Sequence, residues 1–60
     1  MSNNNVTDKW EEIKDLVDML EADITKAAGG NKAAGTRARK GLRAIKNSAA
    51  DLVKLTLGKE

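Results

Sequence analysis

The feature that most constrains this chain is a single break in an otherwise continuous helical pattern. The sequence contains no proline, and its only adjacent glycines, Gly29 and Gly30, lie midway along its 60 residues. Gly29 suits the left-handed residue that ends a helix, and Asn31 suits the N-terminal cap of the next helix. A connection this short makes the flanking helices antiparallel neighbours. The sequence therefore predicts an all-α fold, an antiparallel two-helix hairpin with its turn at residues 29–31.

The expected domain organisation is one helical unit after a short leader. We expect residues 1–6 to form a flexible N-terminus and residues 7–58 to form the hairpin, with helices at about 7–28 and 32–57. Asn5 or Thr7 can cap the first helix, because both side chains accept hydrogen bonds from free backbone N–H groups. Gly58 is expected to end the second helix.

Apolar residues in the first helix recur with the alternating spacing of three and four that is typical of a helix-packing seam. The set is Trp10, Ile13, Val17, Leu20, Ile24 and Ala27. Folding the chain at its glycines pairs positions whose numbers add up to about 59, so that large residues would face small ones, as interdigitating layers require. On this register a close approach to the first helix explains Gly35, and contact with a second hairpin explains Gly41.

The chain is short for a stable domain, because a 60-residue fold buries a small fraction of its surface. It contains neither cysteine nor histidine, so disulfides and the usual structural metal sites are excluded. Self-association is the expected remedy, and the hairpin is predicted to dimerise into a four-helix bundle. The residues predicted for the homodimer interface are Leu16, Met19, Leu20, Leu52 and Leu55.

Charge is sorted between the two predicted helices. The first carries seven acidic residues and three lysines, a net of −4, whereas the second carries seven cations and one acid, a net of +6. Such sorting is typical of a surface that binds a polyanion. The residues predicted to contact nucleic-acid phosphates are Lys32, Arg37, Arg39, Lys40, Arg43 and Lys46. Free N–H groups of residues 32–34 are expected to add a phosphate site at the start of the second helix.

The kind of nucleic acid follows from what the sequence lacks. It has no Phe or Tyr on which bases could stack, so recognition of single strands on an aromatic platform is not expected. Duplex DNA bound through its phosphates, without sequence preference, is the interpretation that remains. The alternative is that the cations form a solvated helix face that pairs with acids of the first helix. A second alternative function is a helical protein–protein interaction module, a coiled-coil adaptor that does not bind nucleic acid.

Other function classes find no support in the sequence. Ser48 and Thr36 have no histidine to activate them, so an enzyme with catalytic residues, cofactors or a small-molecule substrate is not expected. No metal site is expected from the acids near Glu11. No stretch reaches the ~20 apolar residues of a membrane span, and no signal peptide is visible at the N-terminus, so we expect neither a membrane partner nor export.

The segment Gly30-Asn31-Lys32-Ala33-Ala34-Gly35-Thr36-Arg37-Ala38-Arg39-Lys40 resembles a known family. It is similar to small bacterial histone-like proteins of the chlamydial linker-histone-like type, in which an acidic amphipathic helix precedes a Gly-Asn-Lys-Ala-Ala turn and a basic helix with an Arg-x-Arg element. That element is Arg37-Ala38-Arg39 here. The resemblance covers about residues 8–55 and implies a DNA-binding protein of the bacterial cytoplasm and nucleoid. Chlamydial members continue into a long Lys/Ala-rich tail, whereas this sequence reaches Glu60 without one.

Overall fold

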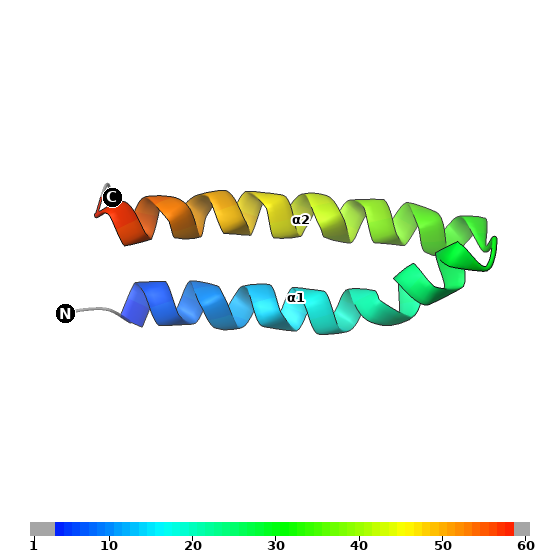
Figure 1. Cartoon of the computed structure of the whole chain (residues 1–60), viewed down its shortest axis with the longest axis horizontal. Helices are drawn as coiled ribbons and strands as arrows, with labels where there is room; N and C mark the ends of the chain where they lie inside the picture. The colour runs from blue at the N-terminus through cyan, green and yellow to red at the C-terminus, as the bar shows by residue number, and fades with distance from the viewer. Residues whose placement is uncertain (1–3, 59–60) are drawn as a thin grey trace.

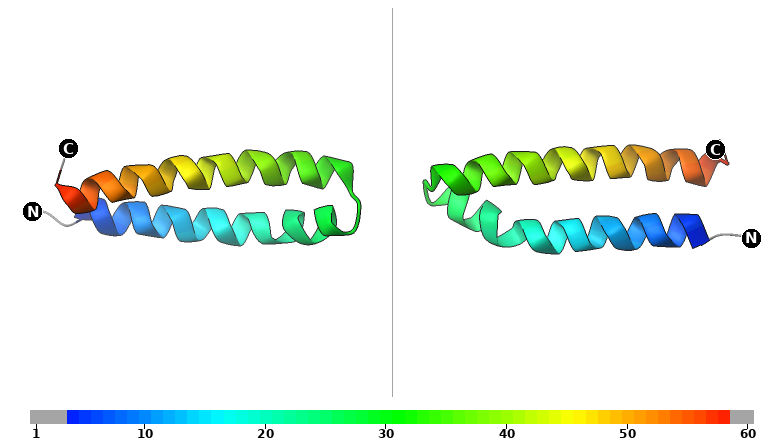
Figure 2. Two further views of the ribbon diagram at one scale, coloured as in Figure 1. Left: turned by 45° about the horizontal axis from the view of Figure 1, so that its top comes forward. Right: turned by 180° about the vertical axis from the view of Figure 1, so that it is seen from behind.

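The computed structural model describes residues 4–58 and folds into two long helices, α1 (Asn4–Ala28) and α2 (Lys32–Leu57). The helices run antiparallel beside each other, so the start of α1 and the end of α2 lie at the same end of the molecule (Figures 1 and 2). Their Cα atoms extend over 45 × 16 × 11 Å. The predicted two-helix hairpin is therefore confirmed. The predicted N-terminal leader lies partly outside the described residues, and its residues 4–6 are helical.

Backbone hydrogen bonds at the turn explain why the chain reverses there. The N–H of Asn31 donates to the carbonyl of Lys26 over 3.1 Å, and the N–H of Gly30 donates to that of Ala27 over 3.0 Å. This pattern is the Schellman ending of a helix. Its left-handed residue is Gly30, with φ of 98°, rather than the predicted Gly29. Asn31 caps α2 as predicted, because its Oδ1 accepts from the N–H of Ala34 over 2.9 Å.

The core between the helices is small and consists of one row of side chains on each helix. Ile13 and Leu20 are buried on α1, and Ala34, Ala38 and Ser48 are buried on α2. The neighbouring half-buried positions extend each row, with the same alternating spacing of three and four. They are Val6, Lys9, Leu16, Asp23 and Ala27 on α1, and Gly41, Ile45, Leu52 and Leu55 on α2.

The predicted seam of α1 was right for half of its residues, since Ile13 and Leu20 are buried and Ala27 is half-buried. Trp10 and Val17 are each 50% exposed and Ile24 is 43% exposed, so these three lie at the edge of the seam rather than inside it. The half-buried places belong to Lys9 and Asp23 instead. Long or polar side chains tolerate such places when the charged end reaches the surface, which both of these do by pairing with α2.

A close contact between Leu20 and Gly41 accounts for the observed rotation. A Cβ atom built on Gly41 would lie 2.6 Å from Cδ1 of Leu20, so the leucine occupies the space that a larger residue would need. Gly41 therefore has its partner within the hairpin, contrary to the prediction of a contact with a second copy. The close approach predicted at Gly35 is absent, because a Cβ there meets only Nη1 of Arg39, at 3.6 Å.

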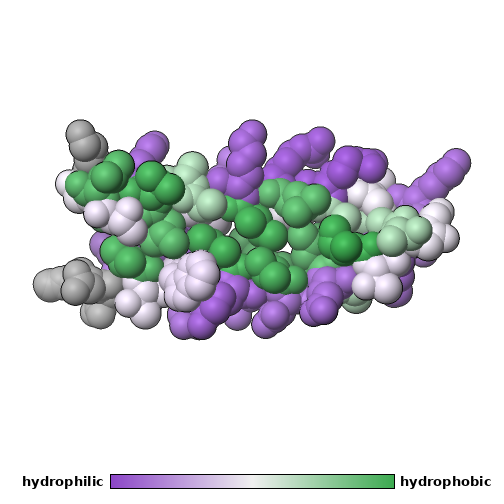
Figure 3. Space-filling view, viewed as in Figure 1, coloured by the Kyte–Doolittle hydropathy of each residue, from purple (hydrophilic) through white to green (hydrophobic). Residues whose placement is uncertain are grey.

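The two edges of the seam differ in character. Along one edge, polar side chains join the helices: Arg37 Nη2 lies 3.0 Å from Asp23 Oδ1, and Lys9 Nζ lies 3.7 Å from Asp51 Oδ2. The other edge is apolar, and the space-filling view shows it as a continuous band between the helices, with hydrophilic side chains on the outer sides (Figure 3). Neither described helix is apolar enough, over a sufficient length, to cross a membrane.

Candidate nucleic-acid interface

Four of the six predicted cations form a straight line along the outside of α2. At 3.6 residues per turn, Lys32, Arg39, Arg43 and Lys46 lie within about 60° of one another. The row of α2 residues that packs on α1, which includes Ala38, is centred roughly 160° away from these cations around the helix. All four side chains are exposed. They therefore point away from α1 into solvent, where a large polyanion can reach them.

A fifth cation belongs to this line and was missed from the sequence. Lys54 lies within about 40° of Lys32 and Arg43 around the helix, and it is exposed. The signal was its spacing of eleven residues from Arg43, which is three helical turns, but the seven residues without a cation after Lys46 hid it. We call Lys32, Arg39, Arg43, Lys46 and Lys54 the basic stripe. It is about 33 Å long at 1.5 Å rise per residue.

The cations of the stripe have no acidic partners among the described residues. Residues 4–58 contain four ion pairs, and none of the four involves a stripe residue. Arg39 donates instead to the hydroxyl of Thr36 over 3.3 Å, which is a contact within the same helix. Unpaired cations keep their full charge available for phosphates, and each cation that neutralises a phosphate of a nucleic acid releases counterions condensed on it, which favours binding through entropy.

Arg37 and Lys40 stand apart from the stripe. The Nε of Arg37 donates to Oδ1 of Asp23 over 3.0 Å, so this arginine is engaged with α1 at the polar edge. Lys40 is exposed at the margin, about 60° beyond Arg43. The structure therefore brings four of the six predicted residues together and assigns Arg37 an additional role in joining the helices.

The start of α2 offers fewer free N–H groups than the sequence suggested. Asn31 already occupies the N–H of Ala34 through its side chain, and its own carbonyl accepts from Gly35 over 3.0 Å. The expected phosphate site at residues 32–34 therefore loses one of its three donors. The helix dipole still adds positive potential at this end, beside Lys32.

The predicted dimer residues lie mainly between the two helices of one hairpin. Leu20 is buried, and Leu16, Leu52 and Leu55 are half-buried, whereas Met19 is 73% exposed. Only Met19 therefore offers most of its surface to another molecule. Association through these residues stays a prediction.

A polar contact at the middle of the seam carries a shifted pKa. The hydroxyl of the buried Ser48 donates to Oε2 of Glu12 over 2.9 Å, and Lys9 donates to Oε1 over 3.3 Å. The hydrogen bond from Ser48, followed by that from Lys9 and its charge, holds the pKa of the Glu12 carboxyl below its ordinary value. Both bonds favour the ionised carboxylate, so this contact helps to hold the helices together rather than to perform chemistry. Among residues 4–58, no three acidic side chains come together as metal ligands would.

Comparison with known families shows the family to which the chain belongs. Residues 7–54 match the family described as histone H1-like protein Hc1. The chain belongs to this family. The match covers both helices and the turn, and it confirms the resemblance seen in the segment around Arg37. Searches of curated proteins and of solved structures found no match.

The histone H1-like Hc1 family is a family of DNA-binding structural proteins rather than of enzymes. Its match includes every residue of the basic stripe, from Lys32 to Lys54. The family and the geometry thus agree on the class of ligand, because a row of exposed, unpaired cations on a histone-like protein suits a nucleic-acid backbone.

Proposed function

We propose that this protein binds duplex DNA without sequence preference, through the basic stripe, as a nucleoid-associated histone-like protein of the bacterial cytoplasm. The observation that carries the proposal is the stripe itself. Five exposed cations follow one face of α2, and none is paired with an acid among residues 4–58. Contacts to phosphates position a protein on DNA but carry no sequence information, and α2 contains no glutamine and a single asparagine for bidentate reading of adenine.

The distribution of negative charge supports one orientation on DNA. Helix α1 carries a net charge of −4 and lies on the far side of α2 from the stripe. A duplex that approached α1 would be repelled by its acids, whereas one that approached the stripe meets cations only. Opposite signs on opposite sides steer the encounter, since electrostatic fields act before contact.

The test compares two variants that remove the same charge. Lys32→Ala with Arg43→Ala removes two stripe cations, whereas Lys14→Ala with Lys26→Ala removes two lysines of α1. Fluorescence anisotropy with a labelled duplex should show weaker binding for the first variant only. The slope of log K against log salt should become shallower by about 1.8, at roughly 0.9 per lost phosphate contact.

The result is informative only if both variants keep the helical content of the parent, which circular dichroism measures. Equal losses for the two variants would mean that net charge alone drives binding and that the stripe is no site. A loss on one DNA sequence but not on another would contradict binding through phosphates.

One observation favours the second candidate function, a protein–protein interaction module. Large apolar side chains remain exposed along one edge of the seam, among them Trp10 and Leu42. A coiled-coil partner could cover them. Anisotropy that shows no DNA binding at low salt would favour this candidate over the first.

A further inference from the structure

The apolar edge of the hairpin is a surface that the proposed DNA contact does not use. Its large side chains are between 43% and 57% exposed, although each could have been buried by a different rotation of its helix. They are Trp10, Val17 and Ile24 on α1, and Leu42 and Val53 on α2. We call this set the apolar face. Exposed apolar patches of this kind on small proteins mark interaction sites.

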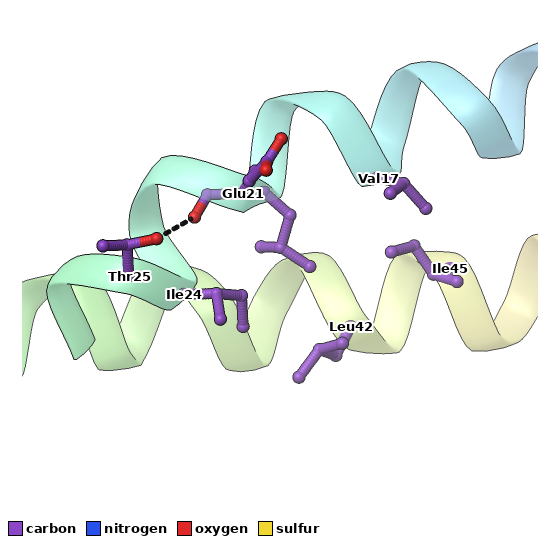
Figure 4. Close-up of a pocket in the computed structure, with 7 residues that line it drawn as sticks. Val17, Glu21, Ile24, Thr25, Leu42 and Ile45 are labelled. Atoms are coloured by element: carbon purple, nitrogen blue, oxygen red, sulfur yellow. Dashed lines mark hydrogen bonds between the residues drawn. The ribbon is translucent and has the colours of Figure 1, made fainter. Parts of the chain in front are cut away.

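The centre of the apolar face is hollowed. Val17 and Ile45 approach each other across the seam, Ile24 points towards α2, and Leu42 turns outwards beside them (Figure 4). Leu20 closes the floor of the hollow. Side chains of a second molecule can therefore enter between the helices instead of meeting a flat surface.

We propose that a second copy of this chain covers the apolar face, about a two-fold axis parallel to the helices. In this dimer α1 of each hairpin packs against α2 of its partner, and the product is a four-helix bundle. Three observations support the arrangement: the fit of large residues to small ones, the charges beside the face, and the available area.

The register of the hairpin fixes which residues would meet. Within one hairpin, facing residues have numbers that add up to 60, as for Asp23 with Arg37 and for Glu12 with Ser48. Rotation about an axis parallel to the helices leaves the height of every residue unchanged, so the same sum holds between the two copies. Helix α1 of one copy therefore faces α2 of the other with the register that it has within its own hairpin.

This register places large residues against small ones. Trp10 lies level, within one residue, with the partner's Ala49, and Ile24 lies level with the partner's Gly35. In the single hairpin a side chain on Gly35 would meet only the flexible end of Arg39, at 3.6 Å. A single hairpin therefore gives no reason for a glycine at position 35, whereas the partner's Ile24 would fill the space beside it. Three residues of the seam predicted within one hairpin, Trp10, Val17 and Ile24, thus belong to the seam that we infer between two.

Charges beside the apolar face distinguish this axis from the other possible one. Glu21 lies level with the partner's Arg39, and neither residue forms an ion pair in its own hairpin among residues 4–58. The two-fold axis perpendicular to the helices would instead set α2 beside α2, with a net charge of +6 on each. Like charges in contact oppose association, so the parallel axis is favoured.

The area of the face is sufficient for a dimer. The two helices span 45 Å by 16 Å, which gives a face of roughly 700 Å² against the ~800 Å² per partner of a standard interface. A two-fold interface repeats each contact, so that Glu21 meets the partner's Arg39 and Arg39 meets the partner's Glu21.

The dimer would present its two basic stripes in opposite directions, because the axis carries α2 of one copy to the opposite side of the bundle. If the stripe binds DNA as proposed, one dimer holds two duplexes and bridges them. Arg39 would then pair with the partner's Glu21, so that each stripe would contact a duplex through its other four cations. Of these, Lys54 lies farthest around α2 from the apolar face.

The test of the dimer uses no DNA, so it can fail or succeed independently of the proposed function. Sedimentation equilibrium at low salt should give the parent chain twice its 6.4 kDa mass. Glu21→Arg alone and Arg39→Glu alone should each weaken the dimer about tenfold, since each sets like charges in contact at two places. Mixed in equal amounts, the two variants should form heterodimers with the affinity of the parent, because every contact is again between opposite charges.

A monomeric parent chain would overturn the proposal. So would a mixture of the two variants that associates no more strongly than either variant alone. Leu42→Asp should also abolish the dimer, whereas Met19→Asp, on the opposite edge, should leave it intact. The reverse pattern would assign the interface to the other edge. Helical content is measured for each variant, and the charge-reversal mixture decides the question even if Leu42→Asp unfolds.

Bridging is measured by whether a bead-bound duplex retains a free labelled duplex. The parent chain should retain it, and Glu21→Arg should lose most of this retention while it still binds one duplex. Strong binding to one duplex without retention of the second, labelled duplex would contradict bridging. No binding to either duplex would contradict the proposed function and leave the dimer untouched.

Discussion

Replacing Gly41 by alanine tests the contact that sets the rotation of the two helices. A Cβ atom at this position would lie 2.6 Å from Cδ1 of Leu20 and 3.5 Å from its Cγ. Leu20 is only 7% exposed but also lines the hollow beside Val17 and Leu42, so the end of its side chain can shift into that space at the cost of its present packing. The same substitution at Gly35 meets no such obstacle within one hairpin. It is the matched control at dilutions where the chain is monomeric, because in the proposed dimer the partner's Ile24 would lie beside it.

The magnitude follows from two opposing terms. Alanine in a helix interior is favoured over glycine by ~1 kcal/mol, and the Gly35→Ala variant should gain up to that amount. At Gly41 the methyl group of Leu20 must move by ~1 Å to reach the 3.5–4.0 Å of an ordinary carbon contact, and overpacking of this kind costs about 1–3 kcal/mol. Gly41→Ala should therefore be neutral or destabilising by up to ~2 kcal/mol.

Thermal unfolding followed by circular dichroism measures the difference. For a chain of this size, 1 kcal/mol corresponds to a change in Tm of about 4–8 °C, so the two variants should separate clearly. A dilution series distinguishes hairpin stability from association, which makes Tm depend on concentration. If Gly41→Ala raised the Tm as much as Gly35→Ala, then Leu20 would not pack closely on α2 and the rotation would need another cause.

Two further predictions concern the polar contacts. The pKa of Glu12 is lowered in the folded hairpin, so its contribution to stability should be present above the ordinary glutamate range of about 4.3 and be lost as the pH falls through the folded value. NMR titration should show this pKa returning towards its ordinary value in Ser48→Ala, and an unchanged value would contradict the assigned cause. Asn31→Ala removes the cap of α2 and should cost ~1 kcal/mol in thermal unfolding, whereas Asn31→Asp, which keeps an acceptor, should cost little.

The hairpin itself was predictable from the sequence, but the rotation of its helices was not. A proline-free chain with one pair of glycines leaves few alternatives to two antiparallel helices. Two overlapping rows of side chains on α1 are each suited to pack on α2, one through Val17 and one through Leu16. The rotation of the helix depends on which row packs. Both rows are largely apolar and both contain Leu20. In the structure the second row packs on α2, with Leu20 against Gly41 and with Lys9 and Asp23 paired at the polar edge.

The candidate site was predictable where it depended on helical spacing alone. Lys32, Arg39, Arg43 and Lys46 share a face in any α-helix, so their grouping needed no tertiary structure. The engagement of Arg37 with Asp23 was not predictable, because it depends on the register between the helices, which the folding at the glycines determines only to within a residue. The outward direction of the stripe likewise required knowledge of which face of α2 packs on α1.

Binding of the parent chain to two unrelated labelled duplexes across a salt series tests whether the basic stripe is a non-specific DNA site. Both duplexes should bind equally well, with a slope of log K against log salt near −4.5 for about five phosphate contacts per hairpin, or near −3.6 where Arg39 is paired in the proposed dimer. Absence of binding at low salt, or a slope close to zero, would contradict it. A strong preference for one duplex would contradict it as well, because the basic stripe offers contacts to phosphates and not to bases.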